Sequence, residues 1–137
     1  MFKMVKTLTA WWPVKVYEPD PEKPGKFVEQ SFEIEFEILD RDQVEEHARQ
    51  RAAIFDDAEG EPTPERLREI ERRLAEHQTK EFQCCVRNWR GVVDDGGNVF
   101  PFSNENLLTA LKHNSIREGI LAAYGEAIDT GKARLGN

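Results

Sequence analysis

The sequence lacks an excess of basic residues, which argues against the partners that depend on one. It has 19 lysines and arginines against 26 aspartates and glutamates, and its formal net charge is -7 at pH 7. The acidic excess is spread along the chain, because residues 1–40, 41–90 and 91–137 each contain more acidic than basic side chains. Binding to nucleic acid and to anionic membranes rests on basic surface charge, so we expect neither as a partner.

Long uncharged runs and separated cysteines are lacking as well. No stretch approaches the roughly 20 apolar residues of a membrane-spanning helix, and no apolar segment typical of a secretory signal follows the first six residues. Cys84 and Cys85 are neighbours and are therefore poorly placed to join distant segments by a disulfide. The expectation is a soluble intracellular protein.

What the sequence does contain suits one domain over residues 1–137. This length is within the usual range of about 100–150 residues, and 8 Phe, 3 Trp and 2 Tyr supply apolar material that disordered chains lack. Alternation of apolar and acidic side chains over 27–39 predicts a strand with one apolar and one acidic face. A second strand is predicted over 7–17, which makes an antiparallel hairpin with a long Pro- and Gly-rich connection. Lys15 is placed to pair with a glutamate of the facing strand.

Helical patterns dominate the rest of the chain. Asp40 and Gln43 form a capping box that predicts a helix to about residue 58, with Val44 and Phe55 on its apolar side. From Thr63, apolar residues three or four apart predict a second helix that continues through Trp89 and stops at Gly91.

A short turn interrupts these helices. The segment 91–100 predicts a tight turn or hairpin between two short extended pieces, and two more helices follow, the first capped by Ser103. The predicted fold is α+β and mainly helical: an N-terminal antiparallel β-hairpin at 1–39 is packed on about four helices of a helical part at 40–137.

The residue types that carry catalysis or bind metals do not form a recognisable pattern. His47, His77 and His113 are far apart and match no metal-binding motif, so they are interpreted as surface or helix-side residues. Cys85 falls on the apolar side of the second predicted helix and is interpreted as a small core residue. The sequence therefore predicts no catalytic residue, no metal ligand, no cofactor and no enzyme; only a cluster formed in space, such as His77 with a cysteine, would reverse this.

Five aromatic residues point to protein binding. Trp11 and Trp12 are adjacent on one predicted strand and point to opposite faces, so both cannot enter one core. One of them is either covered by the domain's own helices and loop or shielded by a partner. Trp89, Phe100 and Phe102 flank the predicted turn, where they are either core anchors or a partner-binding edge. All five are candidate partner-binding residues.

The segment 89–108, WRGVVDDGGNVFPFSNENLL, contains in order W-x-G-V, D-x-x-G, P-F-S-x-E-N and a pair of leucines. In this it resembles the signature of the tail assembly chaperones of long-tailed bacteriophages. The resemblance is gapless over the whole segment.

Other parts of the chain are similar to the same family. Trp12–Val14 corresponds to its aromatic-Pro-Val strand, a Pro/Gly loop follows, and Phe32–Phe36 gives its F-x-x-x-F before a helix. The end is similar through residues 123–124 and 131–134. The chain departs from the family in ending with Gly136-Asn137, where such chains often end in Lys-Asn. Residues 41–80 contribute only a helical pattern.

The resemblance implies a non-enzymatic assembly factor in the cytoplasm of a bacterial host. Members of the family bind the tape measure protein, keep its long apolar helices soluble, recruit tail tube subunits and are absent from the finished virion. Some also have a longer form, made by frameshifting, that contacts the tube protein. Expected partners are thus the tape measure protein, the tail tube protein and further copies of the chain. The alternative is a structural minor tail or connector protein that stays in the virion.

Overall fold

The computed structural model describes residues 1–57 and 60–136, whose contacts gather in two compact units. Met1–Ile38 and Val86–Asn137 form the first unit, and Leu39–Cys85 form the second. Of the described residues, 48% are helical and 23% are in strands, and an antiparallel hairpin begins the sheet. The predicted class, α+β and mainly helical with an N-terminal hairpin, is confirmed. The prediction of a single domain stays a prediction.

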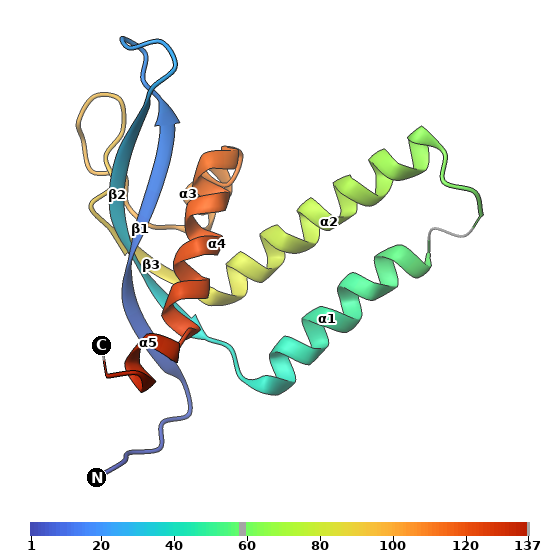
Figure 1. Cartoon of the computed structure of the whole chain (residues 1–137), viewed down its shortest axis with the longest axis horizontal. Coiled ribbons are helices and arrows are strands. Elements are labelled where there is room, and N and C mark those ends of the chain that lie inside the picture. The colour runs from blue at the N-terminus through green and yellow to red at the C-terminus, as the bar shows by residue number, and fades with distance from the viewer. Residues whose placement is uncertain (58–59, 137) are drawn as a thin grey trace. The chain divides into compact units, whose positions relative to one another are not determined.

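The first unit is built on the predicted hairpin (Figure 1). Strands β1 (Leu8–Pro19) and β2 (Phe27–Ile38) pair antiparallel along their full lengths. Alternation places Val14 of β1 and Phe32 of β2 on the same face, opposite each other in the register. The Nζ atom of Lys15 lies 3.8 Å from the carboxylate of Glu29, which confirms the expected cross-strand pair.

A third strand stands where the sequence predicts the end of a helix. α2 ends at Cys85, and β3 (Val86–Arg90) pairs antiparallel with β2, so the sheet order is β1-β2-β3. The predicted continuation of the helix through Trp89 is therefore wrong, and the part at 40–137 contributes a strand as well as helices. The second edge of β2 offers hydrogen-bonding partners to this segment, a long-range contact that local periodicity does not encode.

The core of the first unit includes the interface between the sheet and α4 (Asn114–Ile128), which packs on β1. Gly119 marks the closest approach, because a Cβ atom there would lie 2.6 Å from the carbonyl oxygen of Lys15. The largest fully buried side chains are contributed by both strands of the hairpin and by the C-terminal helical segments: Val14, Ile34, Phe36, Leu107, Leu111 and Ile120.

Two smaller helices belong to the same unit. α3 (Asn104–Ala110) begins after Ser103, whose Oγ accepts a 3.0 Å hydrogen bond from the N–H of Asn106, which confirms the predicted cap. α5 (Gly131–Arg134) is a single turn.

The second unit consists of α1 (Arg41–Asp56) and α2 (Pro64–Cys85), which pack on each other (Figure 1). The capping box of Asp40 and Gln43 is present as predicted. The predicted apolar side of α1 is wrong, because Val44 and Phe55 are 51% and 57% exposed and Ile54 is buried. Gln50 and Arg51 lie on the side of α1 that faces α2, where they contact His77 and Glu81.

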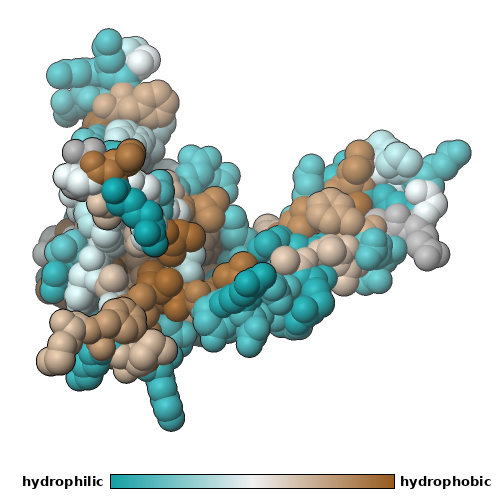
Figure 2. All heavy atoms as spheres, turned by 60° about the horizontal axis from the view of Figure 1, so that its bottom comes forward, coloured by the Kyte–Doolittle hydropathy of each residue, from teal (hydrophilic) through white to brown (hydrophobic). Residues whose placement is uncertain are grey.

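Charge dominates the surface of this second unit. Figure 2 shows its helices covered mainly by hydrophilic side chains, with scattered hydrophobic ones among them. Arg51 of α1 contacts Glu81 of α2 at 2.9 Å, and Arg73 of α2 contacts Asp57, the C-cap residue of α1, at 3.1 Å, so ion pairs join the two helical segments. Over residues 1–57 and 60–136, no helix has both the length and the apolar character needed to cross a membrane.

Candidate functional site

Trp89 is the centre of an aromatic cluster at the start of the 89–108 segment. It is buried on β3, stacks on Phe100 with ring centroids 6.0 Å apart and meets Phe102 edge-on at 5.2 Å. Its indole Nε1 donates a 2.9 Å hydrogen bond to the carbonyl oxygen of Phe100. The structure thus brings together three of the five candidate partner-binding residues. Phe100 and Phe102 are half-buried.

The turn that these rings anchor is held by its own hydrogen bonds. Val93 and Val99 form a bridge, and the carboxylate of Asp94 accepts hydrogen bonds from the backbone N–H of Gly96 and of Asn98 at 2.9 and 3.0 Å. The predicted tight turn is confirmed. Its two valines are 60% and 77% exposed, an unusual position for β-branched apolar side chains.

Two cavities of about 580 and 640 Å³ lie beside this turn. We call the surface that both cavities share the turn groove, and it is formed by Val92, Val93, Asp95, His113 and Ile116.

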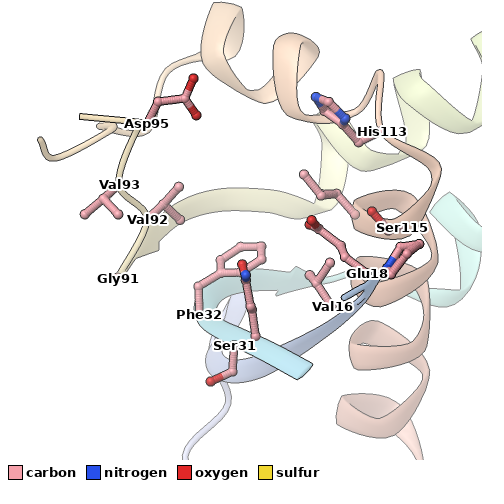
Figure 3. A pocket seen from close by; sticks show the side chains of 13 residues that line it. Val16, Glu18, Ser31, Phe32, Gly91, Val92, Val93, Asp95, His113 and Ser115 are labelled. Atoms are coloured by element: carbon pink, nitrogen blue, oxygen red, sulfur yellow. The ribbon is translucent and has the colours of Figure 1, made fainter. Parts of the chain in front are cut away.

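Figure 3 shows the residues that line the cavity of about 580 Å³ beside the turn. The turn from Gly91 to Asp95 forms one side of the cavity, the start of α4 at His113 and Ser115 forms the other, and the hairpin lies between them. Val16 and Phe32 give the hairpin side an apolar surface. The groove is open, partly apolar and bordered by acidic groups, which suits an extended or helical protein segment better than a small substrate.

Trp11 and Trp12 point to opposite faces of the sheet, as predicted. The indole Nε1 of Trp12 lies 3.5 Å from a carboxylate oxygen of Glu126 on α4. Trp11 lies on the other face, with the guanidinium carbon of Arg90 at 4.1 Å from its ring centre. Both indoles are half-buried, and both have contacts within the first unit.

The outer face of the sheet is organised by ion pairs. Arg90 also donates a 2.9 Å hydrogen bond to Glu33, the residue opposite it in the register, and Arg87 pairs with Glu37 at 2.6 Å. The hydrogen bond and the positive charge of Arg90 lower the pKa of the Glu33 carboxyl.

A histidine cluster in the second unit is not predicted by the sequence. His47 of α1 and His77 of α2 lie with ring centroids 5.8 Å apart, and Glu81 is one helical turn beyond His77. One potential ligand atom from each residue lies within 4.8 Å of the others. The i,i+4 spacing of His77 and Glu81 is a signal visible in the sequence, but the pairing of α1 with α2 that adds His47 is not.

Comparisons with protein families, with curated proteins and with solved structures find no significant match to this chain. The family resemblance therefore rests on the residues of the chain itself.

Proposed function

We propose that this protein is a tail assembly chaperone of a long-tailed bacteriophage or prophage, which binds the tape measure protein and assists assembly of the tail tube. The observation that carries the proposal is the 89–108 segment, whose signature residues run from β3 through the turn into α3. Within it, Trp89 and Phe100 fix the turn and Ser103 caps the helix. The signature residues thus maintain a defined surface element.

The turn groove is the proposed binding site for the client. An amphipathic helix of the tape measure protein would place its apolar side chains against Val93, Ile116 and the hairpin surface. Glu18 and Asp95 border the same cavity, so basic side chains beside the apolar stripe of the client would gain favourable contacts.

The charge of the chain fits the same role. A protein that keeps an apolar client soluble needs a polar surface around a limited apolar contact. Its binding to the unassembled client stabilises the client by mass action. The net charge of -7, spread over the whole chain, provides that surface. The proposed protein is non-enzymatic and acts in the bacterial cytoplasm.

The tail tube protein and a second copy of the chain are further proposed partners. β1 pairs only with β2 among the described residues, so the second edge of this 12-residue strand has no partner strand there, and we propose it as the pairing edge. Light scattering over a range of concentrations tests self-association, and a strict monomer at high concentration would remove this part of the proposal.

Co-expression with the tape measure protein of the same genome tests the main proposal. We expect more soluble tape measure protein and a complex that co-purifies with the tagged chain. Mass spectrometry of purified virions tests the alternative, a minor tail or connector protein. The chaperone is expected in the infected-cell lysate and not in the particle, whereas its presence in stoichiometric amounts in the particle would favour the structural role.

A further inference from the structure

The hydrogen bonds around His77 fix which of its ring nitrogens carries a proton. His77 is 8% exposed, and its Nε2 atom lies 3.1 Å from Oε1 of Gln50. The amide nitrogen of Gln50 donates to the carboxylate of Glu46 at 3.3 Å, which orients the amide carbonyl toward the histidine. Because a carbonyl oxygen only accepts, Nε2 of His77 is the donor, and in the neutral ring Nδ1 carries a lone pair.

That lone pair faces another acceptor. Nδ1 of His77 lies 2.8 Å from Oε1 of Glu81, in a direction that forms no hydrogen bond. Nδ1 of His47, in the same cluster, is also buried and has no hydrogen-bond partner among the described residues. Buried polar atoms without partners are costly and rare. A cation bound between the two imidazoles and the Glu81 carboxylate would give the unpaired nitrogens a partner.

We propose that His47, His77 and Glu81 bind a divalent transition-metal ion of the zinc type. Two imidazoles and one carboxylate form a ligand set that Zn²⁺ prefers, and water completes the coordination. Metal–ligand bonds of about 2.0–2.2 Å place the ligand atoms about 3.3 Å apart, so Nδ1 of His77 and the Glu81 oxygen, now at 2.8 Å, would separate slightly while His47 approaches. The present limit of 4.8 Å therefore closes by about 1.5 Å, a change within reach of side-chain rotation by His47 and Glu81.

The surroundings of the cluster have the form of a supporting shell. Ligating histidines usually donate their second N–H to an acceptor, which is what His77 does with Gln50. Arg51 donates at 2.9 Å to Oε1 of Glu81, the same oxygen that faces His77, so the carboxylate would rotate to present Oε2 to the metal while Oε1 keeps Arg51. Its positive charge opposes the cation, so we expect moderate affinity. A cavity of about 320 Å³ borders His77 and Gln50.

The consequence is a metal link between α1 and α2. Each helix contributes at least one ligand, and the metal is bound only when the two helices are packed together. Binding therefore stabilises the second unit.

Titration of the full chain, stripped of metal by a chelator, tests this proposal with Zn²⁺ by calorimetry and with Co²⁺ by visible absorption. We expect one ion per chain and a higher melting temperature with Zn²⁺. H47Q and E81Q, which keep the size of partly exposed side chains, are expected to weaken binding at least tenfold and to remove the thermal shift. H113Q, in the other unit, is the matched control and is expected to bind like the unsubstituted chain. Circular dichroism verifies that each variant is folded.

Cys84 and Cys85 are the competing metal ligands, and the Co²⁺ spectrum separates them from the histidine cluster. A site of nitrogen and oxygen ligands has no sulfur-to-cobalt charge-transfer band, and binding is expected to persist in C84S. The proposal is overturned if no ion binds, if H47Q binds as tightly as the unsubstituted chain, or if the charge-transfer band appears and binding is lost in C84S.

Discussion

The indole Nε1 of Trp89 donates a 2.9 Å hydrogen bond to the carbonyl oxygen of Phe100, and the two rings stack 6.0 Å apart. This pair closes the turn between β3 and α3, so one buried side chain determines the position of the exposed turn. The stability of the fold and the shape of the proposed binding surface are therefore linked through Trp89.

Trp89→Phe is expected to destabilise the protein by about 1–3 kcal/mol, because it keeps an aromatic ring but removes part of the buried indole and leaves the carbonyl of Phe100 without its donor. Urea unfolding followed by circular dichroism measures the change. Trp12→Phe is the matched control, since its 3.5 Å contact with Glu126 is exposed, and a change within about 0.5 kcal/mol is expected. Equal losses in the two variants would show that the buried hydrogen bond has no special weight.

Two glycines of α4 form a second matched pair. Gly119→Ala is expected to destabilise by about 1–3 kcal/mol, because the added methyl group would lie 2.6 Å from the backbone oxygen of Lys15. Gly125→Ala meets nothing within 4 Å and is expected to stabilise by up to about 1 kcal/mol, through the higher helix propensity of alanine. Thermal unfolding of both variants measures these changes, and a neutral or stabilising Gly119→Ala would contradict the close packing of α4 on β1.

The ion pair of Glu33 and Arg90 is expected to contribute to the loss of folding stability at low pH. The hydrogen bond from Arg90 lowers the pKa of Glu33 in the folded state. A lowered folded pKa contributes stability above the unfolded value, about 4.3, and this contribution is lost as pH falls through the folded pKa. E33Q is expected to lose less stability than the unsubstituted chain between about pH 5 and pH 3.

Salt provides the control for that prediction. The side chains of Glu33 and Arg90 are 46% and 56% exposed, so screening at about 1 M salt is expected to reduce the difference between the two proteins. Glu46 and Glu69 also have lowered pKa values, each through a hydrogen bond from an arginine of the same helix, and they account for acid sensitivity that E33Q retains. Identical pH profiles at low salt would show that the Glu33 pair contributes nothing.

Local patterns in the sequence predict the local parts of this fold. The alternation at 27–39 predicts β2, the capping box at Asp40 predicts the start of α1, and Ser103 predicts the start of α3. Each of these signals depends on residues that are close together in the sequence, so it can be recognised without knowing the tertiary structure.

Contacts between distant segments account for what the sequence does not predict. The apolar spacing of Val86–Arg90 continues the helical pattern, but the segment forms a strand because it can hydrogen-bond to the open edge of β2. His47 meets His77 only because α1 packs on α2. The turn groove likewise combines the turn with the hairpin and with the start of α4, and no spacing in the sequence encodes that combination.

The amount of tape measure protein that co-purifies with the tagged chain, compared between V93D and V99D, tests the central claim most directly. Both valines are exposed partners in one bridge, so both variants are expected to fold, but of the two only Val93 borders the cavities of the turn groove. The account predicts a complex with the unsubstituted chain and with V99D, and at least a tenfold smaller yield with V93D. An unchanged yield of the complex with V93D would contradict the assigned binding surface. Failure of the unsubstituted chain to form a complex would contradict the proposed function itself.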